Sequence, residues 1–355
     1  MIFGSRLIRS LASSPSHSLT DLYQPFFGRK VQRKALLIGI SYVQEEYRSN
    51  PELQLPQGLQ RDVDGIRTLL EDRFEFKKED ITVLTDFPGV PRDQWPTKTN
   101  IETAIQDFVD GVKAGDIRFL FYAGHGHQIH NDNSREDDKR DEHIVPCDAV
   151  GPDFIAEKMI IDDFLKNTLV MPLAAADANL TAVFDCCHSG TVLDLSHYRC
   201  NDCTSWTSNA RRIYRHVFST PSVNLTLMVP FTINMFRSAA SIYLDPHIED
   251  CKGFCSLSKR KGPGYVCISA CRDGEQAWGG TRGGALTRAF IQALEHNPKL
   301  TLKELNVFLH TEVTIRSKNA EKRRRKQQKA DPSKMVQRLQ ISSLWPLDMN
   351  QNFML

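Results

Sequence analysis

A chain of 355 residues is long enough for one large α/β domain or two average domains, each with a sizeable core. Its formal net charge of +2, with 25% charged residues, excludes an overall polyanion-binding character, so any nucleic-acid or membrane role would have to be local. All nine cysteines lie between positions 147 and 271, several within apolar runs, which favours a reducing intracellular setting over a small secreted disulfide scaffold.

The first residues have part of the composition of a mitochondrial transit peptide, with arginines and serines and no acid before Asp21. The alternative is a short flexible leader, to which we assign residues 1–32. We expect a cytoplasmic protein, with a mitochondrial or nuclear location as alternatives. The longest apolar stretch outside the expected core, 225–236, is about half of the roughly 20 residues that a spanning helix needs, so we expect a soluble chain without a membrane partner.

Strands and helices are predicted to alternate along the rest of the chain. Short apolar runs predict strands at 34–40, 81–84, 118–123, 180–186 and 265–269. Apolar residues recur at helical spacing after Asp62 and after Asn100, and a further helix is expected over 285–294. This alternation predicts an α/β fold in which a mainly parallel sheet is covered on both faces.

Two of the predicted strands end in glycine-flanked reactive side chains. The strand at 118–123 runs into Gly-His-Gly at 124–126, and the strand at 180–186 runs into Asp-Cys-Cys-His-Ser-Gly at 185–190. The carboxyl ends of parallel strands meet at one edge of a sheet, so we expect His125 and Cys187 to lie close together.

A cysteine and a histidine at one sheet edge predict a cysteine peptidase. A thiol with its ordinary pKa of about 8.5 is mostly protonated at neutral pH, so Cys187 needs a base, which His125 can supply. In this interpretation His125 also protonates the leaving amine, and the backbone N–H groups of Gly126 and Cys187 hold the oxyanion.

Other thiols and motifs have simpler interpretations. Cys186 points to the opposite face of its strand from Cys187 and is predicted to be a packing residue. A cysteine phosphatase loop would need arginine six positions after its nucleophile, where this chain has Leu193. Cys200-x-x-Cys203 with Cys251 and Cys255 could in principle bind zinc, but a gap of about 50 residues and unequal spacers argue against it.

Residues 196–263 break the alternation of strands and helices. We interpret them as an exposed linker between a large segment, 33–195, and a small segment, 264–355, that completes the same domain. A second basic run, 316–329, is predicted to be a solvated loop. Its lack of interleaved aromatic residues argues against the alternative of a nucleic-acid partner.

Several motifs in one order carry a resemblance to a known family. Gly-His-Gly at 124–126, Asp-Glu at 141–142, Ile-Asp-Asp at 161–163, Asp-Cys-Cys-His-Ser-Gly at 185–190 and Ser-Ala-Cys at 269–271 together resemble the type I metacaspases of the caspase-like cysteine peptidase clan. The resemblance implies a caspase-hemoglobinase fold, a three-layer αβα sandwich with a mainly parallel central sheet. It also implies a dyad of Cys187 and His125, activation by calcium, and cleavage after arginine or lysine.

The resemblance further implies the acids of two sites. Asp185 and Asp62 fall on the positions of the two acids that receive the basic substrate side chain, in keeping with the high cost of burying an unpaired cation. For Asp62 a helix N-cap is the alternative. Asp162, Asp163 and Asp194 fall on the calcium-binding acids, with Asp141 as a fourth.

If the resemblance is set aside, the acids assigned to calcium have another interpretation, as members of a solvated acidic loop and of a helix cap. Two residues depart from the family pattern, since Ala123 and Cys186 stand where many relatives have serine.

We therefore expect a monomeric, calcium-stimulated cysteine endopeptidase that acts on proteins or peptides with arginine or lysine at the cleaved position. Self-processing is expected at basic residues of the linker, namely Arg211, Arg212, Lys259, Arg260 and Lys261. The alternative is a catalytically inactive caspase-fold interaction protein.

Overall fold

The computed structural model describes residues 29–44, 53–55, 58–132, 139–151, 154–202, 251, 255, 264–272, 275, 277, 283–326 and 337–355, with 323–326 described by their backbone alone. Gln32–Leu355 form one compact unit. The leader up to residue 28, the apolar stretch 225–236 and the basic residues expected to be self-processed lie outside the described residues. Among the helices of the described ranges, none has the length and apolar character needed to cross a membrane.

Six strands within the described residues form the central sheet, in the order β2-β1-β3-β7-β8-β9. They are β1 (Arg33–Gly39), β2 (Ile81–Thr85), β3 (Ile117–Ala123), β7 (Asn179–Asp185), β8 (Tyr265–Ser269) and β9 (Gln340–Ser343). All neighbouring pairs are parallel except β8 and β9, which are antiparallel. The five predicted strands are confirmed, and β9 is an edge strand that apolar runs did not predict.

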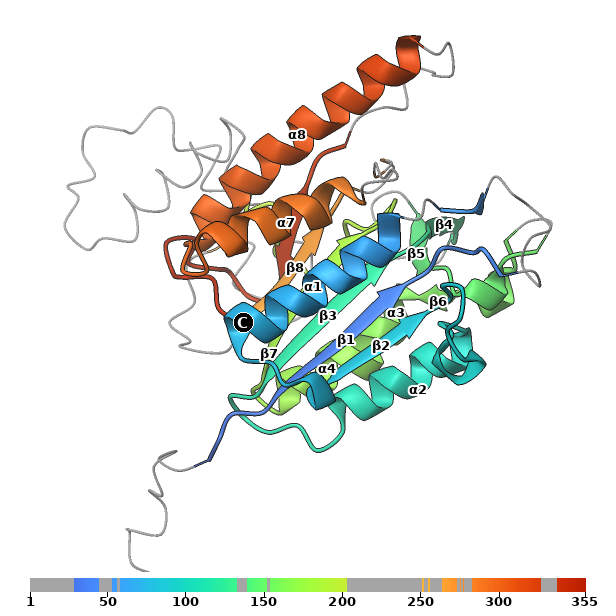
Figure 1. Cartoon of the computed structure of the whole chain (residues 1–355). Helices are drawn as coiled ribbons and strands as arrows, with labels where there is room; N and C mark the ends of the chain where they lie inside the picture. The colour runs from blue at the N-terminus through green and yellow to red at the C-terminus, as the bar shows by residue number, and fades with distance from the viewer. Residues whose placement is uncertain are drawn as a thin grey trace, which may run out of the picture. The chain divides into compact units, whose positions relative to one another are not determined.

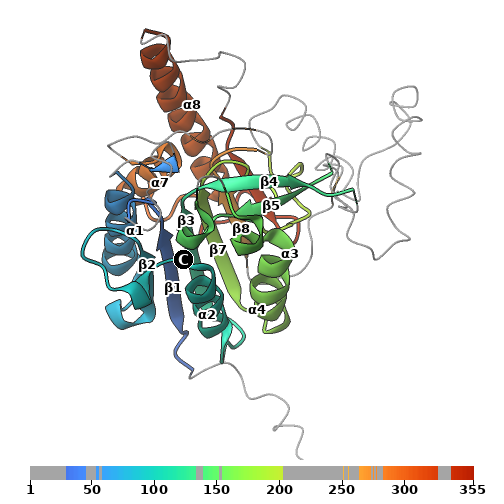
Figure 2. The same cartoon turned by 90° about the vertical axis from the view of Figure 1, so that its right-hand side faces the viewer.

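Helices cover both faces of this sheet (Figures 1 and 2). One face packs against α1 (Gly58–Phe74), α7 (Ala285–His296) and α8 (Leu302–Lys326), and the other against α2 (Lys98–Val109), α3 (Asp162–Leu165) and α4 (Met171–Ala175). Alternate strand residues serve the two cores, because successive side chains of a strand point to opposite faces. Leu37 of β1 thus belongs to the first core and Leu36 to the second. The predicted three-layer αβα sandwich is confirmed.

A second, antiparallel sheet starts where β3 ends. Its strands are β4 (Gly126–His130), β5 (Arg140–Ile144) and β6 (Ile160–Ile161), in the order β4-β5-β6. Figure 2 shows β4 and β5 at the end of the molecule where the arrows of the central strands point. The loop between β3 and β4, which carries His125, therefore lies at the carboxyl edge of the central sheet.

Two helical segments differ from the sequence prediction. Helix α8 runs to Lys326, so residues 316–326, which we expected to be a loop, continue a helix whose buried residues Leu305, Leu309 and Val313 lie before them. Between α3 and α4 the chain is π-helical over Lys166–Val170. Pro172 explains the wider turn, since it has no N–H and its ring would clash with the carbonyl of Thr168.

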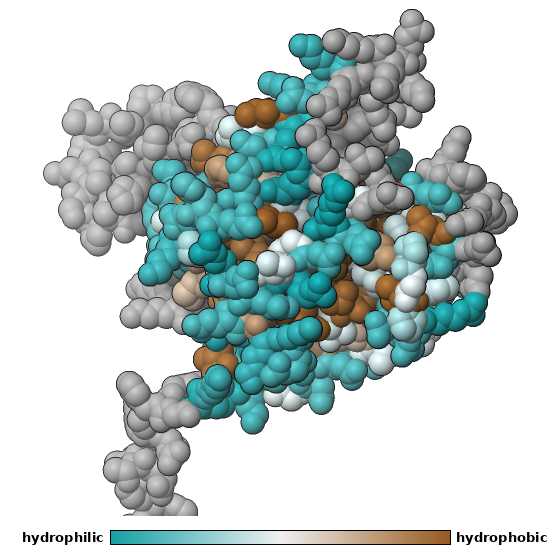
Figure 3. All heavy atoms as spheres, viewed as in Figure 1, coloured by the Kyte–Doolittle hydropathy of each residue, from teal (hydrophilic) through white to brown (hydrophobic). Residues whose placement is uncertain are grey.

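On the face seen in Figure 3, hydrophilic residues predominate and hydrophobic residues show in small separate groups.

Candidate active site

The loops that carry His125 and Cys187 leave the sheet side by side. Strands β3 and β7 are parallel neighbours in which Ala123 pairs with Asp185. At Gly126 a Cβ atom would lie 1.9 Å from the carbonyl oxygen of Cys187, so a residue with a side chain would force the two loops apart. The structure thus brings together the strand ends that the sequence predicted to meet.

One ring nitrogen of His125 is fixed by the main chain. Its Nε2 lies 2.7 Å from the carbonyl oxygen of Leu53. Because a carbonyl oxygen can only accept a hydrogen bond, Nε2 must carry the proton and Nδ1 is left as the basic nitrogen. Burial lowers the pKa of His125, so the neutral imidazole is favoured.

Two buried tyrosines hold the backbone of His125. The hydroxyl of Tyr42 accepts a hydrogen bond from the His125 N–H at 2.9 Å and donates to the carbonyl oxygen of Val145 at 2.7 Å. The hydroxyl of Tyr122 donates to the carbonyl oxygen of His125 at 2.7 Å. Both peptide groups of His125 are therefore positioned from the core side.

Asp86 in turn positions Tyr42. Its carboxylate accepts hydrogen bonds from the N–H groups of Ser41 and Tyr42, both at 2.6 Å, and from the Ser41 hydroxyl at 2.9 Å. Tyr42, Tyr122 and Asp86 were not predicted from the sequence. The available signal was that Tyr42 and Asp86 each follow a predicted strand by two residues.

Cys187 lies under the loop that follows β8. Its Sγ accepts a hydrogen bond from the N–H of Ala277 at 3.3 Å, and burial raises the pKa of the thiol. Within the described residues no hydrogen bond joins Cys187 to His125. The site is therefore in a state in which a neutral thiol and a neutral imidazole are each held by a backbone group.

Glu275 ties this covering loop to the cysteine loop. Its carbonyl oxygen accepts a hydrogen bond from the N–H of His188 at 3.3 Å. Its carboxylate accepts from the Arg338 N–H at 2.8 Å and from Arg338 Nε at 2.7 Å. The loop after β8 is thereby connected both to the residue after Cys187 and to the chain entering β9.

The two acids assigned to a basic substrate side chain lie next to each other. Asp62 is buried in the interior of α1, so it is not the N-cap that we considered as an alternative. Burial, reinforced by the charge of neighbouring Asp185, raises the pKa of Asp62 to about 8. Burial also raises the pKa of Asp185. Two carboxyl groups this close are difficult to ionise together in the absence of a cation.

The N-terminus of α7 covers this acid pair. The N–H of Gly284 donates to Asp62 at 2.7 Å, and the N–H and hydroxyl of Thr287 donate to Asp185 at 2.8 and 2.6 Å. A Cβ at Gly283 would lie 2.1 Å from Asp62 Oδ1, and one at Gly284 would lie 2.0 Å from Asp185 Oδ2. Gly283 also has a φ of +100°, which favours glycine.

The four acids assigned to calcium do not converge on one point. Asp162 is buried at the start of α3 and accepts hydrogen bonds from the N–H groups of Glu142 at 3.0 Å and Asp163 at 2.6 Å. Burial and the charges of Asp141 and Asp163 raise the pKa of Asp162 to about 6. A divalent cation would stabilise such a carboxylate, but Asp141, Asp162 and Asp163 do not form a compact ligand group in the described structure. Asp194 instead pairs with Lys166.

The remaining thiol of the motif is a packing residue, as the alternation of the strand predicted. Cys186 is buried, with 2% of its surface exposed, and belongs to the core beneath α2, α3 and α4. Its carbonyl oxygen accepts a hydrogen bond from the Cys271 thiol at 3.2 Å.

The described ends of the expected linker are packed rather than exposed. Ser196, Cys200, Asn201 and Cys251 are all buried. Cys203 and residues 203–250 lie outside the described residues.

Comparison with known proteins gives the family. Residues 33–196 match the model of the metacaspase, peptidase C14 domain. Metacaspase-1A of Aspergillus niger is 31% identical over 295 residues, covering 80% of this chain and 68% of the relative. Metacaspase-1A of Neurospora crassa is 41% identical over 166 residues, covering 47% of this chain and 34% of the relative. The chain belongs to the metacaspase family, which confirms the resemblance inferred from its motifs.

The coverage of the relatives is partial. The chain spans little more than a third of the length of the Neurospora crassa and Pyricularia oryzae relatives, at 34% and 38%. Among solved structures, pro-sf-caspase-1 aligns with 89% of this chain and 88% of its own, with 12% identity and a TM-score of 0.41. The family assignment rests on the sequence relatives and not on this distant structural likeness.

Proposed function

We propose that the chain is a cysteine endopeptidase that is stimulated by calcium, cleaves after arginine or lysine, and processes itself within residues 196–263. The observation that carries this proposal is the meeting of three groups at the carboxyl edge of the sheet. His125 and Cys187 follow adjacent strands. Of the acid pair, Asp185 lies two residues before Cys187 in the chain, and Asp62 lies next to Asp185. Membership of the metacaspase family supports the same chemistry.

In the proposed reaction, Nδ1 of His125 takes the proton of the Cys187 thiol as the sulfur attacks the substrate carbonyl carbon. The N–H groups of Gly126 and Cys187 donate hydrogen bonds to the oxyanion. The C–N bond then breaks as His125 protonates the amine, leaving a thioester on Cys187. Water attacks that thioester, His125 takes its proton, and the sulfur leaves with a proton as the carboxylate product is released.

The contacts of the resting state bear on how this reaction begins. The Leu53 carbonyl leaves Nδ1 as the basic nitrogen, and the two tyrosines keep the imidazole at the sheet edge. Sγ of Cys187 is held by Ala277, so the thiol has to approach Nδ1 when substrate binds. Catalytic hydrogen bonds that tighten only in the substrate complex are common.

The acid pair supports the choice of a basic side chain. A guanidinium can bridge two carboxylates and allow both to ionise, because its charge offsets the burial and the repulsion from Asp185 that raise the pKa of Asp62. An aspartate side chain at the same place would bring a further carboxyl group and no positive charge to a pair that is already difficult to ionise. Cleavage after arginine or lysine, rather than after aspartate, follows from this difference in charge.

Calcium would be held by Asp141, Asp162 and Asp163, and would supply positive charge beside the buried carboxylate of Asp162. Asp194 would join them only after leaving Lys166.

The test compares hydrolysis of peptides that end in arginine, lysine or aspartate before a reporter group, with and without calcium, by the wild type and by Cys187→Ala. We expect calcium-stimulated cleavage of the arginine and lysine peptides by the wild type alone. Equal rates for the two proteins would reject the enzyme and favour the interaction protein. Activity that does not respond to calcium would reject only the calcium part. If Cys187→Ala protein is still cut within 196–263 during purification, self-processing is wrong.

A further inference from the structure

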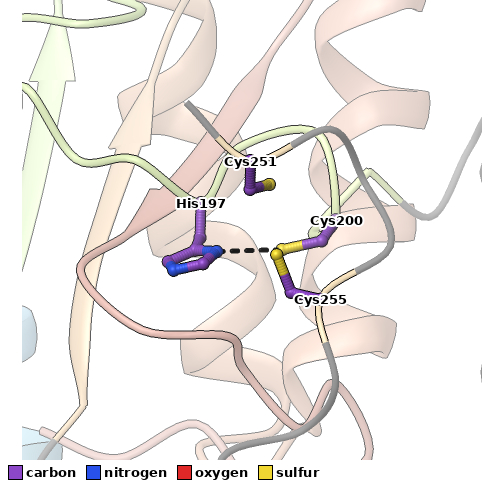
Figure 4. A group of neighbouring side chains, drawn as sticks. All are labelled: His197, Cys200, Cys251 and Cys255. Carbon is purple, nitrogen blue, oxygen red and sulfur yellow. Dashed lines mark hydrogen bonds between the residues drawn. The ribbon is translucent and has the colours of Figure 1, made fainter. Parts of the chain in front are cut away.

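Four side chains outside the active site form a compact ligand cluster. They are His197, Cys200, Cys251 and Cys255, whose potential ligand atoms all lie within 4.8 Å of one another. The first two come from the loop after β7 and the last two from the far end of the expected linker, and all four point toward one another (Figure 4). No other group of this kind occurs among the described residues.

The distances and the chemistry match tetrahedral zinc. Zinc lies about 2.3 Å from thiolate sulfur and about 2.0 Å from imidazole nitrogen, so two ligands of one tetrahedral ion are about 3.5–3.8 Å apart. Sγ of Cys200 and Nδ1 of His197 are separated by 3.7 Å. Three cysteines and one histidine are a recurrent donor set for structural zinc, and the spacings His-x-x-Cys and Cys-x-x-x-Cys are within the usual range.

Hydrogen bonds around the cluster orient its ligands, as is usual around protein metal sites. The N–H of His197 donates to the carbonyl oxygen of Ser343 at 3.0 Å, and the N–H of Cys251 donates to the carbonyl oxygen of Ser196 at 3.0 Å. The side-chain amide of Asn201 donates to the carbonyl oxygen of His197 and to the Ser343 hydroxyl.

Burial separates this group from incidental surface cysteines. Cys200 and Cys251 are only 4% and 6% exposed, and the described cysteines of the cluster are thiols rather than disulfides. A packing role alone would not require the imidazole nitrogen to face the sulfurs. Because all four positions of a tetrahedron are filled by protein, the site would be structural and not catalytic.

We propose that His197, Cys200, Cys251 and Cys255 bind a structural zinc ion that fastens the two ends of the segment 203–250 to each other and to β9 and α8. The contact with β9 runs through Ser343, and the contact with α8 runs through the side-chain amide of Asn306, which donates to the carbonyl oxygen of Asn201 at 3.2 Å. The spacing that argued against zinc in the sequence included Cys203, which lies outside the described residues, and left out His197.

The experiment measures metal in the full chain carrying Cys187→Ala, so that proteolysis does not intervene and the result is independent of the proposed peptidase activity. Protein purified without chelators should contain about one zinc per chain, which a thiol-blocking mercurial releases to a colorimetric chelator. Cys255 is the least buried cysteine of the cluster, and Cys255→Ala should lower the zinc content at least about tenfold. His197→Cys should retain the metal, and His197→Asn should lose it.

Cys267→Ala is the matched control, since this buried thiol of β8 lies outside the cluster and its loss should leave the zinc content unchanged. Should a ligand variant fail to fold, cobalt substitution of the parent protein gives a second readout through the absorption of tetrahedral cobalt thiolate. Folded parent protein without zinc, zinc that survives both Cys255→Ala and His197→Asn, iron in its place, or a disulfide within the cluster would each overturn the assignment.

Discussion

The Tyr42 hydroxyl accepts the N–H of His125 at 2.9 Å while the two rings lie 4.7 Å apart between centroids. A single side chain thus supports both the backbone and the imidazole of the proposed base. Asp86 holds the backbone of Tyr42, so the arrangement reaches from the end of β2 to the end of β3.

The first prediction concerns this hydroxyl. Tyr42→Phe keeps the ring contact but leaves the buried N–H of His125 without its partner, at a cost of about 1–3 kcal/mol in the free energy of unfolding. The carbonyl oxygen of Val145 keeps the longer hydrogen bond from the Tyr122 hydroxyl, at 3.3 Å. We expect kcat to fall about tenfold with little change in KM, because the base is displaced and the substrate contacts are kept. Steady-state kinetics and urea denaturation provide the measurement. Tyr265→Phe, a buried tyrosine in β8, is the control, and an equal loss of kcat there would contradict a specific role for Tyr42.

The second prediction separates the two adjacent thiols. Cys187→Ala should reduce activity to the background rate, since it removes the nucleophile. Cys186→Ala should keep activity within about threefold and lower the free energy of unfolding by about 1 kcal/mol, because it empties a buried packing position. Parallel rate and denaturation measurements test both. Activity that survives in Cys187→Ala and disappears in Cys186→Ala would reverse the assignment.

The third prediction concerns the acid pair and pH. The pKa of Asp62 is raised to about 8 in the free protein, so ionisation of that group should accompany binding of a basic ligand, and affinity should rise with pH up to about 8. Calorimetry of an arginine peptide binding to Cys187→Ala protein, in buffers of different ionisation enthalpy, should detect proton release near pH 7. Adding Asp62→Asn should abolish that release and weaken binding about 100-fold. Unchanged proton release in this variant would exclude Asp62 as the source.

The fourth prediction concerns the contact between the two catalytic loops. Gly126→Ala places a methyl group 1.9 Å from the carbonyl oxygen of Cys187, so the loops must separate and activity should fall at least about 100-fold. Gly264→Ala is the control, since its added methyl group would meet only Val266 at 3.9 Å. Full activity of Gly126→Ala would show that the close approach is not needed for catalysis.

The fifth prediction concerns the ion pair of Asp194 with Lys166. If Asp194 joins Asp162 in holding calcium, Lys166→Met should free it and lower the calcium concentration for half-maximal activity. Asp162→Asn should raise that concentration strongly. Calcium titrations of peptide hydrolysis measure both, and an unchanged midpoint in Lys166→Met would place Asp194 outside the calcium site.

The elements predicted correctly from the sequence are those with a strong apolar pattern. Strand β3 and strand β7 are almost wholly buried, so their apolar runs identify them and place His125 and Cys187 at one edge. The strands of the second sheet were missed because β4 and β5 are short and rich in polar residues. The basic half of α8 was taken for a loop because it has no apolar periodicity, although a helix can continue from a buried first half.

The side-chain networks were less predictable than the elements. Asp62 and Asp185 were paired through the family resemblance, and nothing in their spacing shows that α7 would cover them. Tyr42 and Tyr122 support His125 through hydroxyl contacts across neighbouring strands, and such contacts leave no periodic signal in a sequence. His197 was missed for the same reason, since its partners Cys251 and Cys255 follow more than 50 residues later.

The position of the cysteine and histidine cluster in the sequence determines how the two fragments remain connected after cleavage at a given basic residue. Arg211 and Arg212 lie between its two halves in the sequence, so a chain cut there would stay bridged through the metal as well as through the pairing of β7 with β8. Lys259, Arg260 and Lys261 come after Cys255. Cleavage at any of them would cut the chain before β8 and leave all four ligands of the metal on the larger fragment.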